Sequence, residues 1–162
     1  MGAPPAAPPV RFPVPRGGVI PMSVWLTLIK LDPALLPASP AFVTSLFFDR
    51  PPSAGIDPDE DVLGIDNFDE LVDLADPAAP HPWIARATRG TGSAEVDCGL
   101  RYWGAFVHDP ATVAEIAANL PNSVELALEA DDEVEFEADF DDVRAFYRQA
   151  AREGKAIVGG AH

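Results

Sequence analysis

One cysteine and one histidine lie close enough in the sequence to suggest nucleophilic chemistry. Cys98 follows Asp97 directly, and His108 lies a short distance further along the chain. A thiolate, a histidine base and a carboxylate that orients the base can together carry out covalent catalysis. The alternative is a buried cysteine that packs as a small apolar side chain. A reactive cysteine needs an electropositive setting, which its sequence neighbours do not provide, so we favour the structural alternative.

A short glycine-rich segment, Gly90-Thr91-Gly92-Ser93, follows Arg86 and Arg89. Consecutive backbone N–H groups and arginine side chains can hold a phosphate or a carboxylate. A true phosphate-binding loop leads directly into a helix with a Lys-Ser/Thr signature, whereas this segment leads toward a strand. A simple connecting loop is therefore the favoured interpretation.

Three aspartates at alternate positions, Asp57, Asp59 and Asp61, resemble the start of a calcium-binding loop. Such a loop requires glycine at its sixth position and a bidentate glutamate at its twelfth. Those positions hold Val62 and Phe68 in this chain. We therefore predict an acidic surface loop without a metal, and the sequence indicates no cofactor elsewhere.

Two aromatic residues precede His108 in a strand-like segment. Tyr102 and Trp103 point to opposite faces if this segment is a strand, so one of them is expected nearer the surface. Together with Asp97 and His108, they could line a ligand or catalytic pocket at the end of a sheet. Core packing is the commoner role of large aromatics. These four residues form a candidate binding site, and we assign no catalytic residue.

The net charge is strongly negative, since 26 Asp and Glu residues against 11 Lys and Arg give −15. The blocks Asp57–Asp76 and Glu125–Asp142 contain many acids and no Lys or Arg. This charge argues against nucleic acid or an anionic membrane as a partner. Acidic blocks usually form a solvated face, but they can also attract a basic protein. The candidate contacts in the second block are Asp131, Asp132 and Glu133.

The length of 162 residues is typical of one domain. Residues 1–21 are rich in proline and are expected to form a flexible tail, followed by a single globular domain at 22–162. Hydrophobic residues make up 48% of the chain, which is enough for a packed core. No apolar run approaches the ~18 residues that a membrane span needs.

Strand-like and helix-like segments alternate along residues 22–162. Apolar and β-branched runs predict strands at 24–29, 96–107 and 155–158, and alternation within 124–136 suggests an acidic hairpin around Asp131-Asp132. Helical spacing and capping residues predict helices at 40–49, 66–75 and 110–120, a turn after Asp32, and a last helix that Asp139 caps and Gly154 ends. Prolines predict an irregular stretch at 77–83. Such interleaving indicates an α/β or α+β layered domain.

Three stretches of the sequence are similar to the YfbM-like family. They are 22–29 (MSVWLTLI), 99–107 with 109–120 (GLRYWGAFV and DPATVAEIAANL) and 140–158 (FDDVRAFYRQAAREGKAIV). This is a bacterial family of unknown function. The resemblance implies a compact α/β domain with a mixed sheet and helices packed on it. It also implies a cytoplasmic protein without a known cofactor, and it supplies no catalytic residues.

Two functions from different classes are compatible with these features. We favour a non-enzymatic protein-binding domain of the immunity or adaptor type, in the bacterial cytoplasm, whose acidic surface meets a basic partner. The alternative is a small enzyme or ligand-binding protein with a pocket near Asp97, Tyr102, Trp103 and His108. Whether the chain is an enzyme is left open by its residues.

Overall fold

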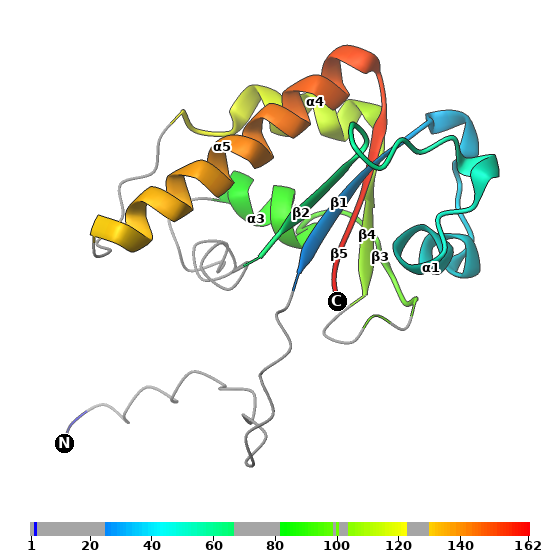
Figure 1. The fold of residues 1–162 in the computed structure, drawn as a ribbon, viewed down its shortest axis with the longest axis horizontal. Helices are drawn as coiled ribbons and strands as arrows, with labels where there is room; N and C mark the ends of the chain where they lie inside the picture. The colour runs from blue at the N-terminus through cyan, green and yellow to red at the C-terminus, as the bar shows by residue number, and fades with distance from the viewer. Residues whose placement is uncertain (1, 3–24, 67–81, 99, 101–103, 123–129) are drawn as a thin grey trace.

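The computed structural model describes residues 2, 25–66, 82–98, 100, 104–122 and 130–162, with the backbone alone for 130–137 (Figure 1). The expected tail at 1–21, except residue 2, and the expected helix at 66–75, except residue 66, lie outside these residues. Tyr102 and Trp103 of the candidate pocket also lie outside them.

The five strands described form one antiparallel sheet. They are β1 (Leu26–Leu31), β2 (Val62–Ile65), β3 (Glu95–Val96), β4 (Ala105–His108) and β5 (Ala156–Ala161), in the order β2-β1-β5-β4-β3. The layered α/β or α+β architecture is confirmed. The mixed sheet is not, because each neighbouring pair of these strands is antiparallel. The last strand, β5, lies between β1 and β4 and runs opposite to both.

The two central strands are buried along their whole length. Helices cover both faces of the sheet, so β1 and β5 have apolar or small residues at most positions rather than an alternating pattern. The two polar exceptions in β1 are Thr27 and Lys30, and Lys30 is paired with carboxylates. Gly159 of β5 lies opposite Phe106 of β4, and a Cβ at Gly159 would lie 2.2 Å from the Phe106 ring. Glycine is required there because the ring lies across the strand.

Helices lie on both faces of the sheet (Figure 1). One face packs against α3 (Pro82–Arg89), α4 (Pro110–Asn119) and α5 (Ala130–Glu153). The other packs against α1 (Pro40–Phe48) and two 3-10 turns, η1 (Pro33–Leu35) and η2 (Pro52–Ala54). The described residues therefore form two hydrophobic cores, one on each side of the sheet.

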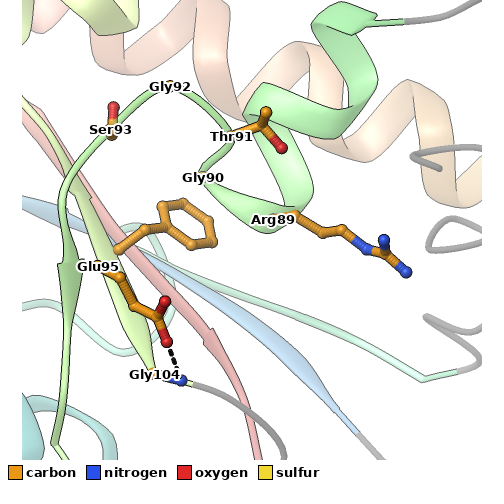
Figure 2. Close-up of a pocket in the computed structure, with 8 residues that line it drawn as sticks. Arg89, Gly90, Thr91, Gly92, Ser93, Glu95 and Gly104 are labelled. Carbon is orange, nitrogen blue, oxygen red and sulfur yellow. Dashed lines mark hydrogen bonds between the residues drawn. The ribbon is translucent and has the colours of Figure 1, made fainter. Parts of the chain in front are cut away.

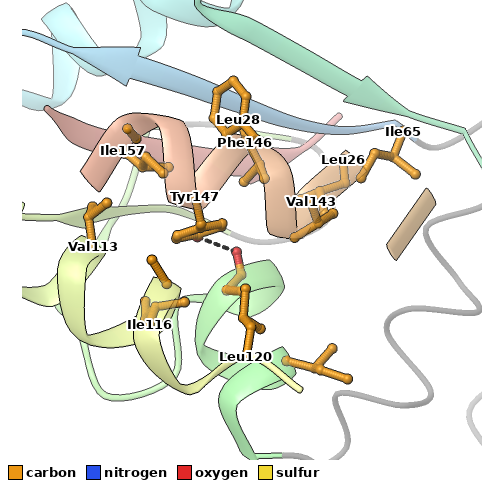
Figure 3. Packing of buried hydrophobic residues seen from close by; sticks show 14 of the residues in the cluster. Leu26, Leu28, Ile65, Val113, Ile116, Leu120, Val143, Phe146, Tyr147 and Ile157 are labelled. Carbon is orange, nitrogen blue, oxygen red and sulfur yellow. Dashed lines mark hydrogen bonds between the residues drawn. The ribbon is translucent and has the colours of Figure 1, made fainter. Parts of the chain in front are cut away.

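The last helix contributes the predicted apolar stripe to the larger core (Figure 3). Val143, Phe146, Tyr147 and Ala150 of α5 are all buried. The Tyr147 hydroxyl donates a 2.6 Å hydrogen bond to the Ala87 carbonyl of α3, so the stripe also joins two helices. Gly154 follows α5 with a φ of +66°, as expected of a residue that ends a helix.

Capping residues set the starts of two other helices as predicted. Ser39 Oγ accepts from the Phe42 amide at 3.2 Å and begins α1. Asp109 Oδ1 accepts from the Thr112 amide at 2.8 Å and begins α4. In both helices proline occupies the first turn, where its missing N–H leaves no bond unmade. The closing strand predicted at 155–158 is also confirmed, as β5.

The acidic hairpin expected around Asp131-Asp132 is wrong for the residues from Ala130 onward, which form the start of α5. Alanine and glutamate favour helix, and the alternation of Val134 and Phe136 covers too few residues to define a strand. Asp139 consequently lies inside α5 and does not cap it.

Two further expectations need correction. The single strand predicted at 96–107 is two strands, β3 and β4, which pair with each other through Val96 and Ala105. Trp83 was expected in an irregular stretch but lies in α3. Pro82 is the first residue of that helix, a position at which proline favours a helix start rather than preventing one.

Candidate functional site

The glycine-rich segment Gly90–Ser93 connects α3 to β3 and forms one wall of a cavity of about 440 Å³ (Figure 2). Gly90 has a φ of +71°, and a Cβ there would lie 2.2 Å from the Cβ of Phe106. Glycine is therefore required by the backbone conformation and by the close approach to β4. The remaining lining residues are Arg89, Glu95, Gly104 and Phe106.

The opposite wall of this cavity is held by a bond between the ends of β3 and β4. The Gly104 amide donates to Glu95 Oε1 at 3.1 Å, as the dashed line in Figure 2 shows. The segment Gly90–Ser93 leads into a strand, as the sequence predicted, and does not begin a helix. It therefore lacks the helix N-terminus that a phosphate-binding loop uses.

A serine and a histidine meet at this loop. Ser93 Oγ lies 2.7 Å from His108 Nδ1, and His108 Nε2 lies 2.7 Å from the Arg86 carbonyl oxygen. A carbonyl can only accept, so Nε2 carries the proton and donates to it. In the neutral ring Nδ1 then holds a lone pair, and the Ser93 hydroxyl donates to it. We call Ser93, His108 and the Arg86 carbonyl the Ser93–His108 centre.

The surroundings of His108 keep its ring neutral. The residue is fully buried, and its ring lies 4.9 Å from that of Phe106 and 6.3 Å from that of Tyr147, centre to centre. Burial lowers the pKa of His108 below its usual 6.5, and the positive charge of Arg86 acts in the same direction. The hydrogen bond to the Arg86 carbonyl and the charge of Asp109 oppose this shift without cancelling it.

The side chain of Arg86 covers the outside of the same loop. Its guanidinium stacks 4.7 Å from the centre of the Trp83 ring and lies 3.5 Å from Glu115 Oε2. Its Nε–H is buried without a hydrogen-bond partner among the residues that the structure describes. This nitrogen would be 3.7 Å from a Cβ at Gly92, so it lies against the loop.

The residues expected to form a pocket are only partly brought together. His108 is buried and its two ring nitrogens are occupied by Ser93 and Arg86, whereas Asp97 is exposed. Cys98 is buried, and its carbonyl accepts from Thr44 Oγ1 at 2.8 Å. The group that contacts the histidine is therefore Ser93 rather than Cys98 or Asp97.

A second hollow unites the two acidic blocks of the sequence. A groove of about 470 Å³ lies between β2 and α5. Asp59 and Glu60 of the first block and Asp142 of the second line it, and within the described ranges these three exposed carboxylates form no ion pair. Apolar and polar neighbours complete this acidic groove: Val62, Leu63, Ala145, Phe146 and Gln149.

Beside the acidic groove lies a set of paired charges around the buried Lys30, which we call the Lys30 cluster. Its ion pairs are Lys30–Asp61 at 3.4 Å, Lys30–Glu153 at 3.0 Å, Lys155–Asp61 at 3.2 Å and Lys155–Glu153 at 3.8 Å. Burial alone would raise the pKa of Asp61, but the Asp57 amide and Lys155 hold it below its usual value. The hydrogen bond from Lys30 lowers the pKa of Glu153.

The same ion pairs involve Asp61, one of the three aspartates that resemble the start of a calcium-binding loop. Asp61 turns inward to the two lysines, and Asp57 Oδ1 accepts from the Asp59 amide at 2.9 Å. In the part of the chain that the structure describes, no three His, Cys, Asp or Glu side chains are grouped so that they could hold a metal ion.

The remaining candidate contacts, Asp131, Asp132 and Glu133, lie in the first turns of α5. Acidic residues are favourable at that end of a helix because its dipole is positive there. They belong to the same helix as Asp142, which places them and the acidic groove on one continuous element.

Comparison with protein-family models, with curated proteins and with solved structures found no match to this chain. The resemblance to the YfbM-like family therefore stays a prediction. Among the described residues, no helix has both the length and the apolar content to cross a membrane.

Sequence reasoning identified His108 and the Gly90–Ser93 segment but not their contact. Ser93 and His108 belong to different elements, and no motif spacing predicts that a loop serine meets a strand histidine. A usable signal was present in the two glycines around Thr91: both have a positive φ, and Gly90 allows the chain to pass close over Phe106 of β4.

Proposed function

We propose that this chain is a cytoplasmic protein-binding domain of the immunity or adaptor type, and that its acidic groove takes a basic segment of a partner protein. One observation carries the proposal. Acids that lie more than 80 positions apart in the sequence, Glu60 and Asp142, line one groove together with Phe146. The apolar residues can contact the stem of a lysine or arginine while the carboxylates bind its charged end.

The neighbouring Lys30 cluster supports this assignment of roles. Asp61 is already paired with two lysines, so it contributes fold stability and little net charge. Asp59 and Glu60 are exposed and project from the same turn. An incoming cation would therefore meet these carboxylates together with Asp142.

Affinity capture from the native host, compared between matched charge variants, tests the proposal. The groove variant is Glu60→Gln with Asp142→Asn, and the control is Asp49→Asn, an exposed acid at the end of α1 on the other face of the sheet. We expect one basic protein, captured in stoichiometric amount at about 50 mM salt and released at about 500 mM, because screening shortens the reach of exposed charges.

The variants decide whether the acidic groove is responsible. The groove variant is expected to lose most of the captured partner, mainly through slower association, while Asp49→Asn retains it. Equal capture by the groove variant and the control would place the contact elsewhere. Capture of no basic protein from the host would contradict the proposed function itself.

A further inference from the structure

The Ser93–His108 centre has the geometry of an activated nucleophile. We propose that Ser93 is a nucleophile, with His108 as its general base, in a site that hydrolyses small carboxylic esters. This activity goes beyond protein binding at the acidic groove and does not depend on it. The cavity beside Gly90–Ser93 is where the substrate would bind.

Hydrogen bonding fixes the histidine in the state that a general base requires. The Arg86 carbonyl accepts from Nε2, so the Nδ1 lone pair faces Ser93 Oγ at 2.7 Å. This distance is within the reach that proton abstraction needs. The backbone carbonyl takes the orienting role that a carboxylate has in a Ser-His-Asp triad.

Packing holds the base in place from several directions. The Arg86 carbonyl belongs to the last turn of α3 and also accepts from the Gly90 amide at 3.2 Å. Phe106 and Tyr147 lie against the imidazole, which is fully buried. A base held in this way needs little rearrangement before the reaction, which is what preorganised sites require.

The nucleophile borders the cavity, whereas its base is fully buried. Ser93 is half-buried and lines the cavity, whose volume of about 440 Å³ lies in the usual range for small-ligand sites, roughly 300–1,000 Å³. Glycine backbone and the Phe106 side chain form much of the lining, which suits a short acyl group. Arg89 and Glu95 lie at its border.

A buried N–H group without a hydrogen-bond partner lies against the same loop. The Arg86 Nε–H is buried without a hydrogen-bond partner among the described residues, and it packs on Gly92, next to Ser93 in the chain. A buried donor that makes no hydrogen bond requires a reason. Arg86 is not among the described residues that line the cavity, so we assign this donor no part in the reaction.

The reaction proceeds in two balanced steps. Ser93 Oγ attacks the ester carbonyl carbon while His108 Nδ1 takes the hydroxyl proton, and the bond to the leaving alkoxide then breaks as His108 returns that proton to it. The products of this step are an alcohol and an acyl-Ser93 ester. Water, deprotonated by His108, attacks the acyl carbon and releases the carboxylic acid, and the proton passes back to Ser93 Oγ.

Labelling with a fluorophosphonate and hydrolysis of p-nitrophenyl acetate test this proposal on the full chain. We expect one phosphonyl group per chain, located at Ser93 by peptide mass mapping. Ser93→Ala should abolish labelling and lower the hydrolysis rate by at least about 100-fold, the usual size of such effects. Ser53→Ala removes an exposed hydroxyl from η2, outside the cavity, and should change neither result.

Variants at the same position separate chemistry from folding. Ser93→Cys keeps a nucleophile of similar size, so it should retain covalent labelling by a thiol-directed reagent and slow ester hydrolysis. His108→Gln should lower the labelling rate of Ser93 by about 100-fold or more. If that variant does not fold, the pH dependence of labelling in the wild-type protein supplies the same information.

Labelling of the wild type should follow the neutral fraction of His108. The charged or titratable groups around this ring are Arg86, Asp109 and Tyr147. The rate is expected to rise with pH and to reach half its maximum below pH 6.5. A folded wild-type protein that is not labelled at Ser93, or that hydrolyses the ester no faster than Ser93→Ala, would overturn the proposal. Neither result would affect capture of a basic partner.

Discussion

The Lys30 cluster and the Ser93–His108 centre occupy the same row of the sheet, yet one is charged and the other neutral. Lys30 of β1 and His108 of β4 both lie opposite Ile157 of the central strand β5. Side chains opposite one another in a sheet point to the same face, so both polar residues lie beneath α5. Phe146 covers Lys30 and the adjacent Tyr147 covers His108.

The difference shows two ways in which a polar residue can be buried. Lys30 is buried but forms ion pairs with two carboxylates, Asp61 and Glu153, and Glu153 remains partly exposed. His108 has no carboxylate at either ring nitrogen, and its burial favours the neutral form. A charge buried among partners mainly stabilises the fold, whereas a neutral imidazole whose Nδ1 lone pair accepts a hydrogen bond from a hydroxyl is available for proton transfer.

Removing the buried charge should have the largest effect on stability. Lys30→Met keeps most of the side-chain volume but leaves Asp61 and Glu153 with Lys155 as their remaining cation in the Lys30 cluster. We expect the free energy of unfolding to fall by about 3–5 kcal/mol, as is usual when one partner of a buried ion pair is removed. Urea denaturation measures it. Lys155→Met, at a partly exposed position, should lower the free energy of unfolding by less than about 1 kcal/mol. Equal losses in the two variants would contradict the larger role of the buried Lys30.

Displacing the Gly90–Ser93 segment beside the Ser93–His108 centre should lower the free energy of unfolding by a smaller amount. Gly90→Ala adds a methyl group 2.2 Å from Phe106 Cβ at a φ of +71°, so both the loop and the strand must move. We expect a loss of about 2–3 kcal/mol. Gly154→Ala is the matched control, because its φ is +66° and nothing lies within 4 Å of the added methyl group. It should cost about 1 kcal/mol.

The hydroxyl of Tyr147 gives a third test next to His108. Tyr147→Phe leaves the Ala87 carbonyl without its buried donor, and complete burial raises the pKa of this phenol, so the lost group is a neutral hydroxyl. We expect a loss of about 1–2 kcal/mol in the free energy of unfolding. The change should not alter the His108 tautomer, which is fixed by Arg86. A shift in the imidazole nitrogen NMR signals to the other tautomer would contradict this.

The pH dependence of stability should be the smallest effect. The two centres should lose stability in different ranges of pH. Burial lowers the folded pKa of His108 below 6.5, so the unfolded chain binds its proton first, and stability falls as pH decreases from about 6.5. Asp61 and Glu153 have lowered pKa values as well, and their contribution falls only below their ordinary values of 3.8 and 4.5. Urea denaturation between pH 8 and pH 3 should show a loss of stability in both pH ranges.

His162 also contributes to the pH dependence of stability, because burial lowers its pKa below 6.5. Its contribution can be removed by substitution. Its Nε2 lies 2.8 Å from Thr27 Oγ1, so His162→Gln keeps a hydrogen-bonding group at that place. The loss of stability as pH decreases from about 6.5 should persist in His162→Gln. An NMR titration that places the folded His108 pKa at or above 6.5 would contradict the assignment.

Local residues in the sequence were enough to predict much of the fold. Ser39-Pro40 and Asp109-Pro110 begin helices because a side-chain oxygen and a fixed proline φ act within one turn. The buried stripe of α5 follows from helical spacing alone. The interpretation failed where neighbouring signals conflicted: alternation at Val134 and Phe136 suggested a strand, but helix-forming alanine and glutamate around them favour the helix that is observed.

The sequence by itself therefore determined the elements, the net charge and the presence of two acidic blocks, because these depend on residues close together in the chain. Only the tertiary structure decided which acids are paired and which are open: Asp61 meets Lys30 and Lys155, whereas Glu60, one residue earlier, joins Asp142 in the acidic groove. It also brought Ser93 to His108. Such contacts depend on the order of strands and on which helix covers each row, and no local pattern encodes that order.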